Sequence, residues 1–475
     1  MALLLRTHQL LPLRFVKTTL PIIFLLLTFC AGLADAATVN ATGSGNWDST
    51  TPDAPWPLGV VPASTDNAVI GPGFTVTVAS AAGINNLTIN GTGICQNNSS
   101  LTVSGSLSGN GTLTQGTSAT LTVAGTSSGL ATLDATSSGN TVNYTGNAGG
   151  GVKLTSYYHL SFSGNGTFFN NAAMVVAGNF TLSGTARVQE GASINIGGDL
   201  TISSGAQYDP SCFPMSVTGN TIVAGTLVDL CGGGGLTDTL GNVTVVAGGK
   251  WQLTDVTQWS VSGSVTNEGT MSGSSGGITC SGTGTLAGSA GISIPHLTVT
   301  GTYTLGTTAT VANTPTLSGM LIIDIGQSYK LVRTGGAITY GGILTVINSG
   351  PAPANGNSFQ LFNASSYNGS FTATNLPALS SGLVWVDTLL TDGTISVATG
   401  SGSGGGSPVL TKSISGGTMT LTWDSAAFSG YVLQAQTNSA GIGAGWGDVP
   451  GGGSSPVTIS IDPANRAVFF RLFKP

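Results

Sequence analysis

One short phrase recurs along this chain at nearly constant spacing, and it limits the possible folds more than any other feature. The phrase is a glycine followed by a small polar residue and then, in most copies, an apolar one. Successive copies lie 20, 21, 22, 22 and 21 residues apart, at Gly178-Asn179-Phe180, Gly198-Asp199-Leu200, Gly219-Asn220-Thr221, Gly241-Asn242-Val243, Gly263-Ser264-Val265 and Gly284-Thr285-Leu286. An earlier copy, Gly139-Asn140-Thr141, lies 39 residues before Gly178. A fixed period of about 20 residues is typical of solenoids, in which each coil contacts only its neighbours.

The residues inside each period indicate β-strands. A recurring apolar-Thr-apolar triplet is found at Leu87-Thr88-Ile89, Leu101-Thr102-Val103, Leu121-Thr122-Val123, Phe180-Thr181-Leu182, Leu200-Thr201-Ile202, Val243-Thr244-Val245 and Leu297-Thr298-Val299. Such alternation of β-forming residues, bounded by Gly, Ser and Asn, is a strand pattern. Side chains alternate faces along a strand, so the aliphatic residues are expected inside each coil and the threonines outside. The sequence therefore predicts an all-β fold with a parallel β-helix.

Composition supports an ordered chain with few charges. Charged residues make up 6% of the sequence, against roughly a quarter in ordinary globular domains, and 74 of the 475 residues are glycine. Disordered chains are poor in β-branched residues, whereas Val, Ile and Thr recur here on schedule. We therefore expect residues 40–398 to be ordered and kept soluble by Ser, Thr and Asn rather than by charge.

The N-terminus has the pattern of an export signal. A basic stretch with Arg6, Arg14 and Lys17 precedes an apolar run over residues 20–33. Ala34-Asp35-Ala36 then supplies small residues for cleavage before Ala37. The alternatives are an uncleaved anchor, for which the run is shorter than the ~20 residues of a spanning helix, and a lipoprotein site at Cys30. We expect a secreted or cell-surface protein with no membrane span after cleavage of the signal.

The mature chain is acidic. Removing Arg6, Arg14 and Lys17 leaves nine of the 12 basic residues, and removing Asp35 leaves 17 of the 18 acidic ones, a net charge near −8. Nucleic acid is an unsuitable partner because phosphate binding needs a clustered basic face.

The chain divides into six segments. Residues 1–36 are the signal peptide, 37–80 an N-terminal cap with Trp47 and Trp56, 81–345 the β-helix repeats, 346–398 an aromatic-rich closing segment, 399–407 a Gly/Ser linker and 408–475 a small β-sandwich. For Trp47 and Trp56 the alternative to capping is sugar stacking. In the last segment, Trp423 and Trp446 are interpreted as core residues rather than ligand platforms.

Four cysteines remain after cleavage. Cys212 and Cys231 are 19 residues apart, about one coil, and stacked strands place equivalent Cα atoms within disulfide range. Their phases within the repeat differ by about two positions, so a disulfide and two separate thiols both remain open. Cys95 and Cys280 are interpreted as isolated buried thiols.

Several segments resemble a known family. They are Gly43-Ser44-Gly45-Asn46-Trp47, residues 62–70, residues 359–397 from Phe359-Gln360-Leu361-Phe362 onward, and Phe469-Phe470-Arg471-Leu472. Together they are similar to the secreted autotransporter-associated β-strand repeat proteins of Verrucomicrobia and Planctomycetes. The resemblance implies a right-handed parallel β-helix with an extracellular, surface-associated role, and it transfers no catalytic residue. This chain departs from true autotransporters because its C-terminal sequence is too short for a membrane barrel of roughly eight or more strands.

Candidate catalytic groups are sparse. Glycoside hydrolysis needs two facing carboxylates, and the candidates are Glu190 with Asp209 and Asp229 with Asp238 or Asp255; of these, only Glu190 and Asp209 are spaced close to one period. Lys153, Arg187 and Lys250 are cations of the repeat region, and they lack the acidic clusters of calcium-dependent lyases. His159 and His296 lie 137 residues apart, and neither predicts a metal site alone. We predict no catalytic, cofactor or metal site.

The outward threonines form the most suggestive surface. Thr102, Thr122, Thr181, Thr201 and Thr244 are predicted to stack in one column, with Asn143 and Ser161 filling its gaps. A rank of hydroxyls can bind polysaccharide or ordered water, although threonine is also simply a good solvated strand former. The asparagines of the phrase, Asn140, Asn179, Asn220 and Asn242, together with Asp199, are expected to hydrogen-bond along one corner of the solenoid.

Three functions are compatible with these patterns. The first is a non-enzymatic extracellular scaffold or adhesin, the second a carbohydrate-binding or carbohydrate-active β-helix protein of lyase or glycosidase type, and the third an ice-binding solenoid. Polysaccharide or other cell-surface components are the expected partners. Self-association through exposed strand edges is a further expectation.

Overall fold

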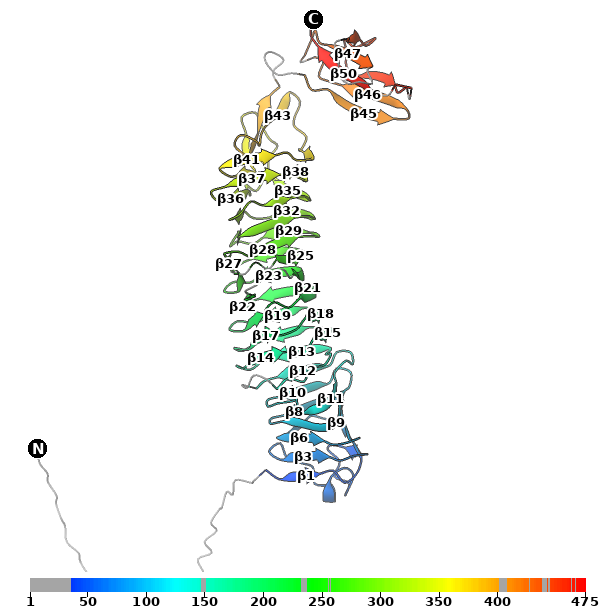
Figure 1. The fold of residues 1–475 in the computed structure, drawn as a ribbon, viewed down its shortest axis with the longest axis vertical. Helices are drawn as coiled ribbons and strands as arrows, with labels where there is room; N and C mark the ends of the chain where they lie inside the picture. The colour runs from blue at the N-terminus through cyan, green and yellow to red at the C-terminus, as the bar shows by residue number, and fades with distance from the viewer. Residues whose placement is uncertain are drawn as a thin grey trace, which may run out of the picture.

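The chain forms a long parallel β-solenoid followed by a small antiparallel unit (Figure 1). The computed structural model describes residues 36–146, 151–231, 237–254, 256, 258–400, 408–426, 428–437, 442, 445–462, 464–465 and 467–475. Most of the predicted signal peptide (residues 1–35) and most of the predicted linker (401–407) lie outside these ranges. The solenoid has about 13 turns, and the predicted all-β class is confirmed. The described part contains one short 3₁₀ helix, η1 (Pro57–Gly59), and none of its helices is long and apolar enough to cross a bilayer.

Each coil of the solenoid contributes a strand to three faces, and the strands of a face pair in parallel from coil to coil. Face 1 consists of β5 (Ala82–Ile84), β8 (Ser100–Val103), β10 (Thr120–Val123), β12 (Thr141–Tyr144), β13 (His159–Phe162), β16 (Phe180–Leu182), β19 (Leu200–Ile202), the second halves of β21 (Met215–Val223) and β23 (Thr237–Val245), β26 (Val265–Asn267), β29 (Thr283–Ala287), β32 (Thr302–Leu305), β35 (Met320–Asp324), β38 (Ile343–Ile347) and β42 (Ala373–Asn375).

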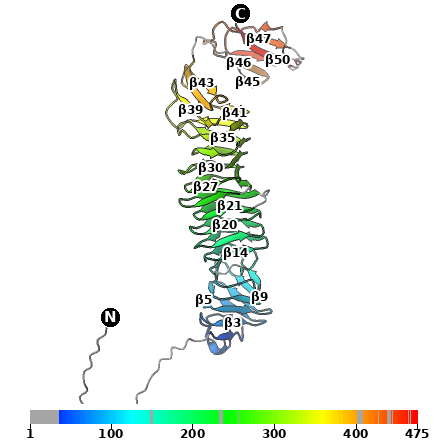
Figure 2. The same ribbon diagram turned by 60° about the vertical axis from the view of Figure 1, so that its left-hand side comes forward.

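Faces 2 and 3 complete the coils (Figure 2). Face 2 consists of β14 (Thr167–Asn170), β17 (Arg187–Glu190), β20 (Gln207–Asp209), β22 (Thr226–Val228), β24 (Lys250–Leu253) and β27 (Thr270–Gly273), then β30 (Ile292–Ile294), β33 (Ala309–Val311), β36 (Leu331–Arg333) and β40 (Phe362–Asn363). Face 3 consists of β15 (Met174–Val176), β18 (Ile194–Ile196), the first halves of β21 and β23, β25 (Gln258–Val261), β28 (Gly277–Cys280), β31 (His296–Val299), β34 (Thr316–Leu317), β37 (Ala337–Tyr340) and β41 (Ser366–Gly369).

The first coils carry two ladders of their own beside face 1. One ladder is β1 (Thr38–Asn40), β3 (Asn67–Ile70), β6 (Asn86–Ile89) and the start of β9 (Leu107–Gln115). The other is β2 (Gly45–Asn46), β4 (Thr75–Val78), β7 (Ile94–Asn97), the end of β9 and β11 (Leu130–Asp134). Parallel stacking therefore includes residues that the sequence assigned to the N-terminal cap.

Aliphatic and aromatic columns fill the interior as the alternation predicts. On face 1, Leu101, Leu121, Val142, Leu160, Phe180 and Leu200 lie in register in successive coils, and each has at most 1% of its surface exposed. The threonines between these inward residues are half-buried on the outer surface. Burial of one such side chain contributes about 1.5–3 kcal/mol, so the repeated columns are the main stabilising feature of the coils.

Aromatic residues close both ends of the solenoid. At the N-terminal end Trp47 and Trp56 pack edge to face with ring centroids 5.0 Å apart, and the Trp56 indole Nε1 donates to the Trp47 carbonyl oxygen at 2.6 Å. At the other end Tyr340 stacks on Phe371, and its hydroxyl donates to the Leu389 carbonyl oxygen at 2.9 Å. An antiparallel sheet follows there, formed by β39 (Ser358–Gln360), β44 (Thr394–Thr399) and β43 (Leu383–Thr388).

The C-terminal unit has two three-stranded antiparallel sheets. One is β45 (Thr411–Ser415), β46 (Thr418–Thr422) and β49 (Val457–Ser460), and the other β48 (Gly447–Asp448), β47 (Val432–Thr437) and β50 (Val468–Phe473). Trp423 belongs to their shared core, as expected. The core prediction for Trp446 is wrong, because its half-buried ring lies under the Arg471 guanidinium, 4.4 Å from carbon to centroid. That guanidinium also donates to Gln434 Oε1, so Trp446 packs on a polar pair rather than in the apolar core.

Candidate functional site

The structure places the predicted threonine column on face 1. Thr102 and Thr122 are in register, Asn143 and Ser161 continue the column, and Thr181 and Thr201 follow. Ile222 then interrupts the hydroxyls before Thr244, which is in register with it. The predicted residues therefore do stack in one column, but Asn143 and Ile222 interrupt its series of hydroxyls.

A ladder of polar side chains runs along the corner that precedes face 1. His159 Nδ1 accepts a hydrogen bond from the Asn179 amide, and the Asn179 and Asp199 side-chain oxygens accept from the amides one coil later, at 2.7–3.0 Å. The ladder continues because Asn242 Nδ2 donates to Asn220 Oδ1 and Asn242 Oδ1 accepts from the Ser264 amide. These bonds satisfy backbone donors at the corner, so the asparagines have the structural role that the sequence predicts.

Asn140 does not belong to this ladder, so the prediction that it hydrogen-bonds with the other asparagines along the corner was wrong. Thr141 is in register with His159, so the earlier copy of the phrase is displaced by one residue. Asn140 consequently points inward and is fully buried, and neither its Nδ2 nor its Oδ1 atom has a hydrogen-bond partner. An unsatisfied buried amide destabilises the fold, so this position is not explained by the ladder.

Face 3 carries a second and more regular hydroxyl rank that the sequence analysis missed. The register aligns Ser216, Thr239, Ser260, Thr279, Thr298, Thr316 and Thr339 in seven successive coils. A parallel rank lies two residues later, and its hydroxyls donate to backbone carbonyls of the preceding coil at 3.2–3.4 Å; its members are Ser262, Ser281, Thr300 and Ser318. The sequence does contain a signal for these two ranks, because Ser/Thr-x-Ser/Thr triplets recur in successive coils. The triplets lie outside the Gly-Asn phrase that was used to find the repeats.

A shallow groove lies at the corner where face 3 meets face 1. It crosses the coils that contain Thr300, Ser318 and Gly342, and it encloses about 550 Å³. Glycines line its floor because a Cβ on Gly301 or Gly319 would lie 1.9 or 2.1 Å from a carbonyl oxygen of the preceding coil. Close stacking of the backbone thus excludes side chains here and leaves the corner hollow.

The described members of the predicted carboxylate pairs lie inside the solenoid. Glu190 is in register with Asn170 rather than with Asp209, which faces Gln189. Glu190, Asp209, Asp229 and Asp238 are each at most 4% exposed, and Asp255 lies outside the described residues. The oxygens of these buried acids accept hydrogen bonds from the Tyr208 hydroxyl, from the amides of Ser211 and Leu230, and from the amides of Cys231 and Met215.

Burial changes the acidity of two of these groups. Desolvation raises the pKa of Glu190 to about 7, opposed by hydrogen bonds from Tyr208 and Asn170 and supported by the charge of Asp209. Desolvation likewise raises the pKa of Asp238 to about 7, opposed by the Met215 amide and supported by Asp229. Raised carboxyl pKa values occur in active sites, but Glu190 and Asp238 face the packed interior, where they accept from the Tyr208 hydroxyl and the Met215 amide.

A disulfide joins the two cysteines whose state the sequence left open. Cys212 and Cys231 are bonded with their Cα atoms 4.7 Å apart. Ser211 and Cys212 both adopt positive φ values, 47° and 65°, and this turn compensates for the difference in phase between the two cysteines.

Cys95 and Cys280 are buried free thiols, and burial raises the pKa of each to about 12. Since the thiolate is the reactive form, we expect both thiols to resist alkylation at pH 8 in the native protein. Peptide mass spectrometry after iodoacetamide treatment should find both unmodified in native samples and modified in denatured ones. Native labelling of Cys280 would show that its coil opens readily.

His159 lies on β13 of face 1 and His296 on β31 of face 3. His296 Nε2 contacts Asn313 Nδ2 at 3.0 Å, and burial lowers the pKa of His159. Among the described residues, no group of three or more His, Cys, Asp or Glu side chains is arranged to hold a metal ion.

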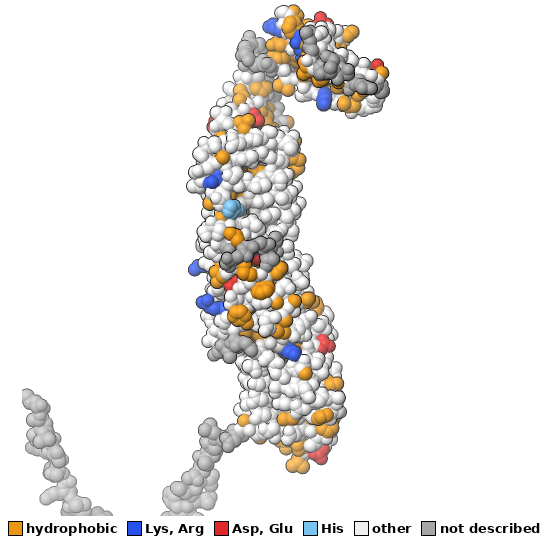
Figure 3. All heavy atoms as spheres, in the orientation of Figure 1, with side chains coloured by type: hydrophobic (Ala, Val, Ile, Leu, Met, Phe, Trp, Pro, Cys, Tyr) orange, Lys and Arg blue, Asp and Glu red, His pale blue; other side chains and the backbone are white. Residues whose placement is uncertain are grey.

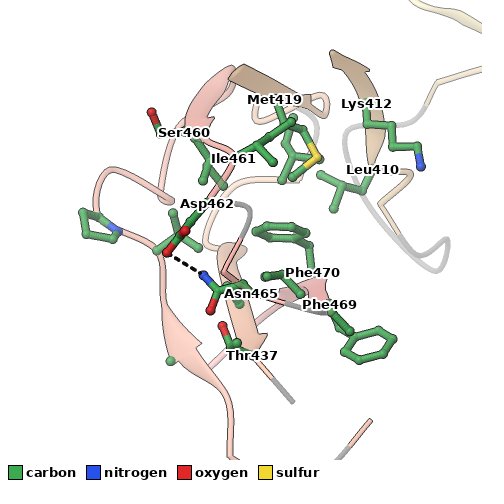
Figure 4. Close-up of a pocket in the computed structure, with 18 of the residues that line it drawn as sticks. Leu410, Lys412, Met419, Thr437, Ser460, Ile461, Asp462, Asn465, Phe469 and Phe470 are labelled. Carbon is green, nitrogen blue, oxygen red and sulfur yellow. Dashed lines mark hydrogen bonds between the residues drawn. The ribbon is translucent and has the colours of Figure 1, made fainter. Parts of the chain in front are cut away.

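The C-terminal unit contains a larger opening between its two sheets (Figure 4). It encloses about 930 Å³ and is lined mainly by aliphatic and aromatic side chains, among them Leu410, Met419 and Phe470. Asp462 and Asn465 are hydrogen-bonded to each other at one edge, and Lys412 lies on β45. The opening lies between the two sheets, and Trp423 of the core does not line it.

Comparisons with known proteins find no relative for this chain. No family model matches it, and no curated protein or solved structure shows a significant similarity.

Proposed function

We propose that this chain is a secreted, non-enzymatic β-solenoid protein that acts as an extracellular scaffold or adhesin at the cell surface. The observation that carries the proposal is the chemistry of the solenoid surface. Hydroxyls and amides occupy most of the registered outer columns, whereas four acids of the central coils, Glu190, Asp209, Asp229 and Asp238, are buried. Figure 3 shows this sparseness of charge on one face.

The ends of the chain support the same role. The N-terminal sequence has the basic, apolar and small-residue order of an export signal. The opening and closing motifs resemble secreted surface-associated repeat proteins. A disulfide in the solenoid is typical of proteins that fold in an oxidising compartment.

An attachment assay tests this function. Cells lacking the gene should attach less to surfaces or to one another than wild-type cells, and the full chain supplied in trans should restore attachment. A chain ending at residue 398, which lacks the C-terminal unit, should restore less. Unchanged attachment on deletion would contradict the proposal, as would polysaccharide turnover by the purified chain that Glu190→Gln abolishes.

We also predict that this protein self-associates. All five residues of β45 are exposed, and β45 has an unpaired edge in its sheet. Because free strand edges template pairing, we expect concentration-dependent oligomers in analytical ultracentrifugation. A strict monomer at high concentration would end this expectation.

A further inference from the structure

We propose that the groove between faces 3 and 1 binds a neutral linear polysaccharide whose chain lies along the solenoid axis. This inference rests on the proposed function, since it names the chemical class of the partner that an extracellular scaffold would hold. It concerns the groove bordered by Thr300, Ser318 and Thr372.

The shape of the groove fits a chain better than a compact ligand. It is open and follows the stacking direction across successive coils, so its length runs along the axis of the solenoid. Stacked strands repeat at about 4.8 Å, which is roughly the length of one sugar unit in an extended polysaccharide. Thr300 and Ser318 present hydroxyls in two successive coils, the next coil has Gly341 at that position, and Thr372 borders the last coil of the groove. The volume of about 550 Å³ lies within the range of ligand-binding clefts.

The hydroxyls that border the groove are fixed in orientation. Ser318 Oγ donates to the Val299 carbonyl oxygen at 3.3 Å, and Thr300 Oγ1 donates to the Cys280 carbonyl oxygen at 3.4 Å. In the last coil that lines the groove, Thr372 Oγ1 donates to the Gly342 carbonyl oxygen at 2.6 Å. Since the protons of these hydroxyls are used within the protein, their oxygen lone pairs are available as acceptors for ligand hydroxyls. Because these hydroxyls are already fixed in orientation, less conformational entropy is lost when a ligand binds to them.

Apolar side chains complete the lining. Leu317, Met320 and Ile343 lie along the same groove, and Met320 and Ile343 are half-buried. A sugar ring has apolar C–H surfaces and polar hydroxyl edges, so a lining of aliphatic groups and oriented hydroxyls matches both. Ordered water at an ice surface would instead favour a flat array, whereas this site is concave.

The charge of the lining selects a neutral partner. None of the residues that line the groove is ionisable. Burying an anionic polysaccharide here would desolvate its carboxylates without a compensating cation. Binding should therefore be insensitive to salt, in contrast to ionic recognition.

Binding to defined polysaccharides tests the proposal. The full mature chain is mixed with microcrystalline cellulose, insoluble chitin or a soluble unbranched β-glucan, and with alginate and polygalacturonate as acidic comparisons. We expect retention by at least one neutral polysaccharide with equal affinity in about 0.1 and 1 M NaCl. Ser318→Glu combined with Thr372→Glu should weaken that binding by about tenfold or more, because hydrated carboxylates would then occupy the groove.

Matched variants make the result specific. Ser318→Ala, which preserves the coil, should weaken binding by about threefold. Thr181→Glu combined with Thr201→Glu places the same charges on face 1, outside the groove, and should change nothing. Circular dichroism should show the same β-structure for all variants.

Four outcomes would overturn the inference: no neutral polysaccharide retained, salt-sensitive binding of the acidic ones, loss of binding only in the Thr181 and Thr201 variant, or thermal hysteresis without polysaccharide binding. If polysaccharide binding fails while the chain still restores cell attachment, this inference falls and the proposed function stands. If attachment also fails, the proposed function falls.

Discussion

Replacing Glu190 with glutamine should stabilise the folded chain by about 3 kcal/mol at pH 8 and by less than about 1 kcal/mol at pH 5. The pKa of Glu190 is raised from 4.5 to about 7 in the folded state, chiefly by desolvation. A raised carboxyl pKa means that the folded state binds the proton more tightly than the unfolded one. Its stabilising contribution is therefore complete below pH 4.5 and is lost as the pH rises through 7. Glutamine remains uncharged and can still accept from the Tyr208 hydroxyl.

Denaturant unfolding of both chains at pH 5 and pH 8 measures this effect. The difference between the two chains isolates Glu190 from other titrating groups. Glu268→Gln is the matched control, because Glu268 is exposed and hydrogen bonds from Ser289 lower its pKa, so glutamine there should not stabilise the chain at pH 8. Equal stability of wild type and Glu190→Gln at pH 8 would show that Glu190 is hydrated rather than buried.

Replacing Trp251 with alanine should destabilise the solenoid by about 3–5 kcal/mol. The Trp251 side chain is fully buried, is in register with Leu227 and Met271, and packs edge to face on Trp259 with ring centroids 5.5 Å apart. Its removal would leave a cavity within one continuous interior column. The backbone ladders on either side limit collapse of the neighbouring coils, so the cavity persists.

Trp251→Phe separates packing from hydrogen bonding in the same column. The Trp251 Nε1 atom has no hydrogen-bond partner, so phenylalanine removes an unsatisfied donor as well as some volume. We expect Trp251→Phe to lower the free energy of unfolding by at least about 2 kcal/mol less than Trp251→Ala does, as measured by urea unfolding. Similar losses for both variants would mean that the column is loosely packed at this coil.

The coil interior could be predicted from sequence because period-two alternation and the 20-residue period agree. In Leu121-Thr122-Val123 the alternation alone predicts that Leu121 and Val123 point inward and Thr122 outward, and the burial of these residues confirms it. Asn140 was misplaced because coils differ in length: Asn143 and Ser161 are in register only 18 residues apart, whereas Thr122 and Asn143 are 21 apart. Counting by a fixed period therefore drifts by one residue, and one residue reverses a side chain.

The candidate sites were only partly predictable for related reasons. Glu190 follows Val188 by two residues, so alternation already indicated an inward carboxyl, whereas the spacing to Asp209 suggested a facing pair. The groove at Ser318 arises from glycine stacking between coils, which no single strand pattern contains. Trp446 lies outside the core because Arg471 and Gln434 hold it there, and that contact joins distant strands.

Fractionation of native cells, followed by N-terminal sequencing of the recovered protein, tests the proposed role most directly. We predict a chain that begins at Ala37 and is found at the cell surface or in the medium. Recovery of the chain from the cytoplasm with its first 36 residues intact would contradict an extracellular scaffold.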